Sequence, residues 1–330
     1  MKKIVVLCMS VLLIVLGGCS QSSKSTVSGK SKIEYPTKPI EVIVPFAPGG
    51  STDIGARIIE KYLPKYLPKA QIVIVNKPGG SGTIAISEVF NAKPDGYKLG
   101  LSTHRAIATQ PLYGKTKYSY DSFQPIAKVF GNQQIMVVKG DAPWKTFEEW
   151  VDYMKKNPGK FTFGVAGGIG SGSHLPMAEL DMIAGLKAKP VPFEGTPPAI
   201  TGILGGHVQG AVLQPSDAKA LIDSGELRAL FNAGSTPVPY FPEVPLLKDK
   251  GYDIVYDSNT SLIAPKNVPQ EIVTMLQKAV KKTMEDPEVI KEFEKANLQV
   301  QYDTAEDVQD ELSKENAKTK VVLKELKLIK

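Results

Sequence analysis

Hydrophobic and polar positions follow two different periods along this chain. Short runs of apolar, β-branched residues, such as the one ending at Val44, are typical of buried strands. Apolar residues spaced three or four positions apart, such as Ile54 and Ile58, are typical of helices that bury one face. The pattern predicts strands at 40–44, 72–75, 99–102, 135–138, 161–165, 208–213 and 227–232. It predicts helices at 52–66, 83–91, 146–156, 173–184, 197–204, 216–224, 269–284, 287–296 and from residue 305 onward.

Strands and helices therefore alternate along most of the chain. This alternation predicts an α/β fold with parallel sheets covered by helices on both faces. The last helix begins with Thr304-Ala-Glu-Asp307, which is a capping-box pattern. A chain of 330 residues is long enough for two domains.

The N-terminal residues 1–18 are predicted to be a lipoprotein signal peptide. Lys2 and Lys3 precede an apolar stretch at 4–16 that is too short to span a bilayer comfortably. The stretch ends in Leu16-Gly-Gly-Cys19, which resembles a bacterial lipobox. Cleavage before Cys19 and lipidation of its thiol would anchor the protein outside the cytoplasmic membrane. Residues 19–33, rich in Ser, Lys and Gly, are predicted to be a flexible tether.

Composition and charge narrow the possible functions. Both cysteines, Cys8 and Cys19, lie in the N-terminal segment, so we expect no disulfide, thiol nucleophile or zinc site in the remainder. The net charge of +6 includes the two leader lysines and is too small and dispersed to indicate binding to nucleic acid. The three histidines are far apart and lack metal-binding spacing. The sequence predicts no metal site, no cofactor and no catalytic constellation.

Two glycine-rich loops join a strand to a helix. The first is Pro48-Gly-Gly-Ser-Thr-Asp53 and the second is Gly167-Gly-Ile-Gly-Ser-Gly-Ser-His174. The first N–H groups of a helix lack internal partners and attract negative charge, so each loop is a candidate anion cradle. The alternative for the first loop is an ordinary turn in which Ser51 or Thr52 caps the helix and Asp53 lies in its first turn. In the second loop, Ser171 or Ser173 is the expected cap.

Other loops also follow predicted strands at their carboxyl ends, where open α/β sheets bind ligands. The segment 77–85 formally matches a dinucleotide fingerprint, but a structural loop or part of a binding cleft fits it better. Phe193-Glu-Gly195 precedes a helix, and residues 214–217 join a strand to another. Arg105 directly follows a strand, and it is either a bidentate carboxylate clamp or an exposed arginine at a helix end.

These motifs together resemble the substrate-binding proteins of tripartite tricarboxylate transporters, the Bug family of solute receptors. The opening Tyr35-Pro-Thr-Lys-Pro39 followed by residues 44–53 is similar to the family's N-terminal signature. The resemblance extends from residue 35 to the C-terminus. It rests further on residues 76–82, 93–97, 170–175, 204–207, 225–230, 241–245, 264–265 and 286–288.

The resemblance implies a periplasmic-binding-protein type II-like fold, in which two α/β domains enclose a ligand cleft and are joined by two crossings. Domain 1 would comprise residues 34–131 and 258–330, and domain 2 residues 132–257, with crossings near Gly131 and Asp257. The resemblance also implies ligand contacts in five loops. With Arg105 added because it directly follows a strand, the candidate residues are Pro48, Gly49, Gly50, Ser51, Thr52, Asp53, Ser102, Thr103, His104, Arg105, Gly168, Gly170, Ser171, Gly172, Ser173, His174, Phe193, Glu194, Gly195, Gln214, Ser216 and Asp217.

The sequence thus predicts a monomeric, lipid-anchored solute-binding protein rather than an enzyme. It would capture a small organic carboxylate and deliver it to the permease subunits of a membrane transporter. We expect the carboxylate to meet His104 or Arg105, while Glu194 opposite disfavours a second negative charge. This favours a monocarboxylate, or an amino or hydroxy acid, over a tricarboxylate. The alternatives are a sensing receptor without transport and an enzyme on the same fold.

Overall fold

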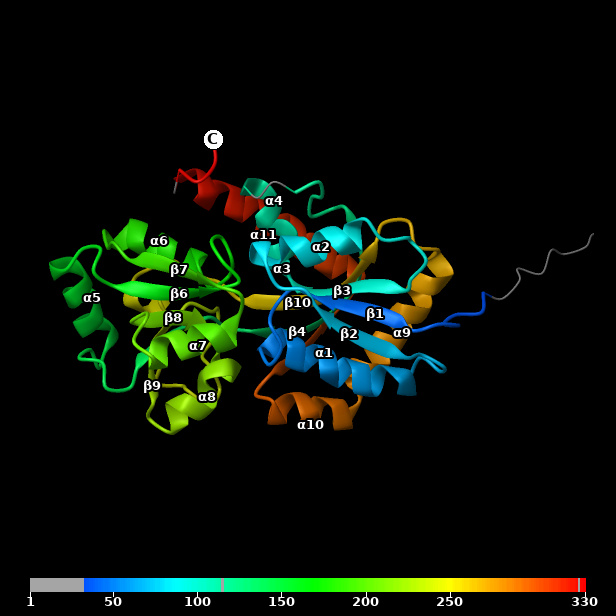
Figure 1. Cartoon of the computed structure of the whole chain (residues 1–330), viewed down its shortest axis with the longest axis horizontal. Helices are drawn as coiled ribbons and strands as arrows, with labels where there is room; N and C mark the ends of the chain where they lie inside the picture. Colours follow the sequence, from blue (N-terminus) through cyan, green and yellow to red (C-terminus); the bar gives the residue numbers. More distant parts are fainter. Residues whose placement is uncertain (1–32, 114–115, 326) are drawn as a thin grey trace, which may run out of the picture. The chain divides into compact units, whose positions relative to one another are not determined.

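The computed structural model describes residues 33–113, 116–325 and 327–330. The predicted signal peptide, its lipidation site at Cys19 and all of the tether except its last residue lie outside the described residues. Glu34–Lys330 form a single unit (Figure 1). Among the helices that the structure describes, none has both the length and the apolar composition needed to cross a membrane.

The predicted alternation of strands and helices is present, with additional short elements. The strands are β1 (Ile40–Val44), β2 (Ile72–Asn76), β3 (Lys98–Thr103), β4 (Phe123–Asn132), β5 (Ile135–Lys139), β6 (Thr162–Ala166), β7 (Lys189–Phe193), β8 (Gly210–Leu213), β9 (Leu227–Asn232), β10 (Ser258–Pro265) and β11 (Gln299–Asp303). The α-helices are α1 (Ser51–Tyr62), α2 (Thr83–Phe90), α3 (His104–Ala108), α4 (Gln110–Tyr113), α5 (Phe147–Lys156), α6 (Leu175–Ala184), α7 (Thr196–Leu204), α8 (Pro215–Asp223), α9 (Gln270–Glu285), α10 (Pro287–Lys295) and α11 (Ala305–Glu325). Three short 3₁₀ turns are η1 (Leu63–Lys65), η2 (Gly80–Gly82) and η3 (Lys248–Lys250).

The strands form two sheets, with orders β11-β4-β10-β3-β1-β2 and β7-β6-β8-β5-β9. Strands β1, β2 and β3 pair in parallel, as do β6, β7 and β8. Strand β10 runs antiparallel to β3 and β4, and β5 runs antiparallel to β8 and β9. Both sheets are therefore mixed: the prediction of parallel sheets holds for β1, β2 and β3 and for β6, β7 and β8, and it is wrong for the remaining strands.

The chain passes from the first sheet to the second between β4 and β5, and it returns before β10 begins at Ser258. These passages lie next to Gly131 and Asp257, the positions named for the predicted crossings. The division of the unit into two domains stays a prediction.

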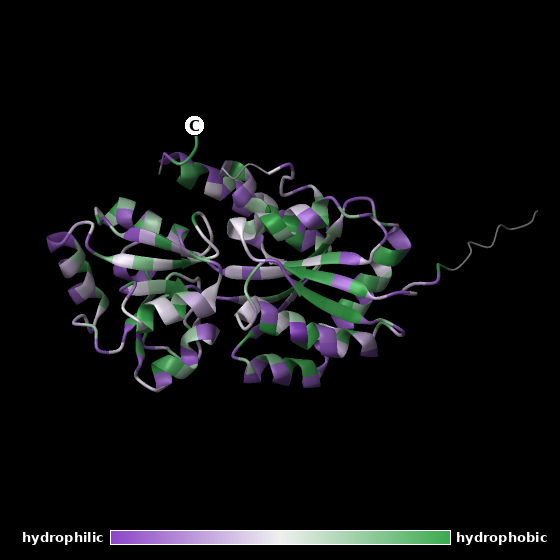
Figure 2. Cartoon of the chain, in the orientation of Figure 1, coloured by the Kyte–Doolittle hydropathy of each residue, from purple (hydrophilic) through white to green (hydrophobic). Residues whose placement is uncertain are grey.

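Each sheet has a hydrophobic core on both faces because inward-pointing residues alternate along its strands. In β1, Val42 and Val44 pack with α1, α9 and α10, whereas Ile43 packs with α2, α3 and α11. In β5, Met136 packs with α5 and α6, whereas Val137 packs with α7 and α8. Figure 2 shows β1 and β2 as largely hydrophobic and the surrounding helices as mixed, with hydrophilic residues along their length. The result is two three-layer α/β arrangements within one unit.

Four strands, β4, β7, β10 and β11, carry no clear period-two signal in the sequence. Strand β4 contains Pro125 and Lys128, yet Lys128 is buried because it pairs with Asp303 and, at 2.9 Å, with Glu311. Strand β7 contains two prolines in five residues, which is tolerated because it lies at a sheet edge. Tertiary pairing thus outweighs local pattern in these strands.

Helix starts differ from the expected capping pattern. Gly50 is the N-cap of α1 and His174 is the N-cap of α6, and neither provides a side-chain cap. The alternative in which Ser51 or Thr52 caps α1 is therefore wrong in its capping residue, although Asp53 does lie in the first turn. The expected cap of α6 at Ser171 or Ser173 is also wrong. The capping box at α11 is confirmed, since Asp307 N–H donates to Thr304 Oγ1 at 3.3 Å and Thr304 N–H donates to Asp307 Oδ2 at 3.1 Å.

Helix α11 packs against the cores of both sheets. Val308 and Leu312 belong to the core of the first sheet, and Leu323 belongs to a core of the second. Near its middle, Lys318 Nζ donates to the Val255 carbonyl at 3.0 Å, just before β10. The helix therefore links the two sheets beside the passage that leads into β10.

Candidate ligand-binding site

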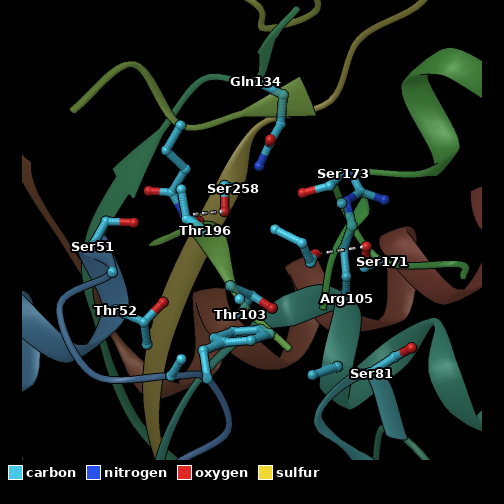
Figure 3. A pocket seen from close by; sticks show the side chains of 18 residues that line it. Ser51, Thr52, Ser81, Thr103, Arg105, Gln134, Ser171, Ser173, Thr196 and Ser258 are labelled. Carbon is cyan, nitrogen blue, oxygen red and sulfur yellow. Dashed lines mark hydrogen bonds between the residues drawn. The ribbon is translucent and has the colours of Figure 1, made fainter. Parts of the chain in front are cut away.

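A small cavity of about 50 Å³ lies between the two sheets, where the loops after β1, β3, β6, β7 and β8 converge (Figure 3). Strand carboxyl ends of parallel segments meet here, which is the usual ligand position in open α/β folds. Most of the polar side chains that line the cavity are hydroxyls, and Figure 3 shows them arranged around it with Arg105 and Gln134. Among the described residues that line it, Arg105 is the only charged one.

Many of the predicted site residues line this cavity. They are Gly50, Ser51, Thr52, Thr103, Arg105, Ser171, Gly172, Ser173, Gly195 and Gln214. The remaining candidates lie beside it or behind it without lining it. They are Pro48, Gly49, Asp53, Ser102, His104, Gly168, Gly170, His174, Phe193, Glu194, Ser216 and Asp217.

Sequence reasoning missed several lining residues: Phe46, Ala47, Ser81, Ala106, Gln134, Ala166, Thr196 and Ser258. Ser81 lies in the glycine-rich segment 77–85, for which a cleft role was one interpretation. Gln134 and Ser258 lie at the two passages between the sheets, so the predicted crossings near Gly131 and Asp257 could have indicated that they lie at the site. Ala106 and Ala166 had no sequence signal of their own.

In the loop before α1, one carboxylate holds the backbone in place. Asp53 accepts hydrogen bonds from Gly49 N–H at 2.9 Å, Arg57 Nε at 3.0 Å and Asn76 Nδ2 at 2.9 Å. Burial by itself raises the pKa of Asp53, but these hydrogen bonds, led by that from Arg57, outweigh it and lower the pKa. Asp53 is therefore ionised and fixes the loop rather than facing the cavity.

A second carboxylate reaches the same helix start from the other sheet. Asp217, in the first turn of α8, accepts Ser51 N–H at 2.9 Å and Ser51 Oγ at 3.3 Å. Burial raises the pKa of Asp217 to about 6, while hydrogen bonds from Thr196 and Ser51 act in the opposite direction. The N-terminus of α1 thus already binds an anionic group, and that group belongs to the protein.

The loop before α6 is different. Gly170 has a φ of +76°, and Ser171 Oγ donates to the Ala166 carbonyl at 3.1 Å, which closes a tight turn. None of the hydrogen bonds in the described chain uses the N–H group of Gly172 or Ser173. Both residues line the cavity, so these two N–H groups are candidate donors to a ligand there.

Arg105 lies beside these donors. Its side chain is 7% exposed, its Nη1 pairs with Glu315 and its guanidinium Cζ lies 4.3 Å from the Tyr256 ring centroid. Its Nε is buried without a partner in the described structure, and a Cβ placed on Gly172 would lie 3.5 Å from it. The alternative of an exposed arginine at a helix end is therefore wrong.

The cavity also offers acceptors. The Oε1 atoms of Gln134 and Gln214 are buried without partners in the part of the chain that the structure describes. Gln214 Nε2 donates to Ser258 Oγ at 3.2 Å, which fixes one amide across the passage between the sheets. A ligand with hydroxyl groups as well as a carboxylate would satisfy both kinds of group.

His104 and Glu194 occupy other positions. His104 hydrogen-bonds Ser261 Oγ at 2.7 Å, and burial, with minor effects of Lys128 and Arg105, lowers its pKa to about 3, so the ring is neutral at pH 7. Glu194 is exposed and lines a separate groove with the 79–82 loop. In the described residues, no group of three or more His, Cys, Asp and Glu side chains could hold a metal ion.

The fold and the site define a class, that of the periplasmic solute-binding proteins. The structure of the periplasmic binding protein BugD is similar, with a TM-score of 0.84 and 29% identity over 89% of this chain and 99% of that one. MatC from Rhodopseudomonas palustris with bound malate is similar with a TM-score of 0.82 and 27% identity, over 88% of this chain and all of that one.

Sequence comparison gives the family. The model of the tripartite tricarboxylate transporter family receptor matches residues 56–328. A Cupriavidus necator relative, the UPF0065 protein in the gbd 5′ region, is 32% identical over 303 residues, which is 90% of each chain. The chain therefore belongs to the tripartite tricarboxylate transporter receptors, the Bug family, and the resemblance noted from its motifs is confirmed.

Proposed function

We propose that this protein is a non-enzymatic receptor that captures a small organic carboxylate in the cavity between the two sheets. The observation that carries the proposal is Arg105, the one charged residue among those described around the cavity, whose buried Nε has no partner. A carboxylate there would receive charge-assisted hydrogen bonds from Arg105 and neutral ones from the Gly172 and Ser173 N–H groups. The malate bound by MatC supports this class of ligand.

We propose that residues 34–131 with 258–330, and residues 132–257, act as two domains that close around the ligand. Contacts that bridge the two sheets around the cavity support this arrangement. Ser81 Oγ donates to the Ile169 carbonyl at 3.1 Å, and Ser51 N–H donates to Asp217 Oδ1 at 2.9 Å. Closure of a monomer would then present the loaded form to the permease subunits of the transporter.

We propose that the mature protein is held outside the cytoplasmic membrane by a lipid on Cys19. The charged start, short apolar stretch and Leu16-Gly-Gly-Cys19 support this localisation. Cys19→Ala should release the protein into the soluble fraction. A Cys19→Ala variant that is cleaved to mature length and still sediments with membranes would contradict the proposal.

Titration calorimetry with malate and with mono-, di- and tricarboxylates of matched chain length tests the binding function. The corresponding amides are the controls, because they keep the shape of each ligand and remove its charge. We expect a carboxylate to bind at least about tenfold more tightly than its amide, since hydrogen bonds to charged groups contribute about 1.5–3 kcal/mol. Equal affinities, or no binding by any carboxylate, would refute the proposal. Uptake of the labelled ligand by cells with and without the protein separates transport from sensing.

A further inference from the structure

The guanidinium of Arg105 has two edges with different surroundings. Nη1 points to one side and pairs with Glu315 of α11. Nε and Nη2 form the other edge of the guanidinium. This edge can bind a carboxylate side-on through two parallel hydrogen bonds. Nε is the buried, unpartnered donor at the cavity. One edge is thus held by the protein and the other is available to a ligand.

Glu315 is held in place by its own contacts. It accepts Thr319 Oγ1 at 3.1 Å and Thr109 Oγ1 at 3.3 Å, and both threonines are buried. The Glu315 side chain itself is 18% exposed. On one face of the guanidinium lies the Tyr256 ring, which limits rotation of Arg105. The position of the available edge therefore depends on Glu315 and on the aromatic ring together.

Charge gives Glu315 a second effect. Without a ligand, Glu315 and Arg105 neutralise each other. When a carboxylate binds the Nε edge, the group of three carries one net negative charge in a partly buried place. Lys318 contacts the Tyr256 ring at 5.0 Å, but it and Lys314 line the neighbouring cavity together with Glu311 and Asp257, which offset them. Each further negative charge on the ligand is therefore repelled by Glu315.

We propose that Glu315 is a specificity-determining positioning residue that fixes the Arg105 edge and limits the negative charge of the ligand. The inference rests on the proposed function, since it concerns how the same cavity selects among carboxylates. Glu315 contacts Arg105 and not the cavity, so it acts through Arg105 and through space. The proposal assigns charge selection to α11 instead of Glu194, which lies in a different groove.

The test is the variant Glu315→Gln, which keeps the side-chain shape and an acceptor for Nη1 but removes the charge. Affinities are measured by calorimetry for acetate, propionate, malonate, succinate, malate and tricarballylate at one pH and one ionic strength. We expect monocarboxylate affinity to rise about three- to tenfold, and the ratio of dicarboxylate to monocarboxylate affinity to rise about threefold or more. Glu315→Asp keeps the charge and should keep the wild-type order of preference.

Asp310→Asn is the matched control, because Asp310 lies on the same helix, α11, is exposed and lines neither the cavity nor the neighbouring one. The ratio of dicarboxylate to monocarboxylate affinity in this control variant should stay within twofold of wild type. If Glu315→Gln does not fold, Glu315→Ser removes the charge, leaves room for water and gives the same readout. The inference is overturned if a folded, neutral variant keeps the wild-type ratio of dicarboxylate to monocarboxylate affinity, or if it loses all binding. Carboxylate binding by the wild type still upholds the proposed function in either case. Failure of the wild type to bind any carboxylate overturns both.

Discussion

The loop before α1 and the loop before α6 look alike in sequence and differ in structure. Both join a strand to a helix through glycines and serines. Before α1, the N–H groups of Gly49 and Ser51 already donate to Asp53 and Asp217. Before α6, the N–H groups of Gly172 and Ser173 are without acceptors in the described chain and lie at the cavity near Arg105.

We infer that a glycine-rich helix start is open to a ligand anion only where no protein carboxylate already occupies it. Helix N-termini attract any negative group, and a side chain of the same protein competes with a ligand for them. The α6 loop, together with Arg105, is therefore the half of the cavity that should bind the ligand carboxylate.

Removing the arginine beside the α6 loop should have the largest effect. Arg105→Ala should weaken carboxylate binding about 100-fold or more, because breaking a buried charged contact commonly costs about 3–5 kcal/mol. Calorimetry measures the loss. Arg228→Ala is the matched control, since Arg228 Nη1 donates to the carbonyls of Trp144 at 3.2 Å and Ala142 at 3.4 Å, and Arg228 does not line the cavity. An Arg105→Ala affinity within threefold of wild type would place the ligand elsewhere.

A methyl group added to each loop should distinguish their backbones. Gly170 has a φ of +76°, and a Cβ there would lie 1.2 Å from Tyr113 Oη, so Gly170→Ala should cost about 1–3 kcal/mol of strain and displace the donors that follow. We expect carboxylate affinity to fall about tenfold. Gly50 has a φ of −81° and its nearest contact would be at 3.7 Å, so Gly50→Ala should fold normally.

Urea unfolding and calorimetry on both glycine variants check this prediction. Gly50→Ala should change the free energy of unfolding by less than about 1 kcal/mol and leave affinity within threefold of wild type. A large loss of affinity in folded Gly50→Ala, with Gly170→Ala unaffected, would reverse the comparison and place the ligand at α1.

Much of the fold was readable from the sequence because most strands and helices have clear periods. The strand at Ile40–Val44 and the helices α5 and α7 agree with their predicted bounds within one residue. Strands β4 and β7 were not readable, since a buried lysine and two prolines interrupt the pattern. The partners that make these residues acceptable, such as Glu311 for Lys128, are 183 residues away in sequence and enter only through tertiary contacts.

The candidate site was likewise predictable from the sequence only in part. Loops at strand ends were predictable, because glycine, serine and sheet topology place them at one edge. What each loop binds was not predictable, since Asp217 reaches Ser51 from 166 residues away and Glu315 reaches Arg105 from 210 residues away. Sequence shows the donors, but only the folded chain shows which donors the protein itself has already used.

The carboxylate at α1 predicts a pH dependence. Burial raises the pKa of Asp217 to about 6, against the lowering effect of the hydrogen bonds from Thr196 and Ser51. If opening exposes Asp217 to water, its pKa there returns to the ordinary carboxyl range, so burying it on closure takes up a proton. Low pH then stabilises the closed form, and this stabilisation is lost as the pH rises through about 6. If closure accompanies binding, affinity should rise about fourfold between pH 7.5 and 5.5.

Calorimetry across this range, with a ligand that stays ionised, tests the pH dependence. Asp217→Asn cannot ionise and should give a flat profile. The control is Asp223→Asn on the same helix, where Asp223 pairs with Lys219 at 2.5 Å on the surface, and this variant should keep the wild-type slope. A wild-type affinity that is independent of pH, or one that falls on acidification, would contradict a role for Asp217 in closure.

The smallest effect should come from removing serine hydroxyls, because the comparison assigns the ligand to backbone donors. Ser173 lines the cavity, but its hydroxyl makes no hydrogen bond among the described residues, whereas Ser51 Oγ contacts Asp217 at 3.3 Å. Each Ser→Ala change removes at most one neutral hydrogen bond, worth about 0.5–1.5 kcal/mol. Carboxylate affinity should therefore fall no more than about tenfold in Ser173→Ala and remain unchanged in Ser51→Ala. A loss of 30-fold or more in a folded Ser173→Ala variant would make the hydroxyl a direct ligand contact and reduce the backbone donors of the α6 loop to a supporting role.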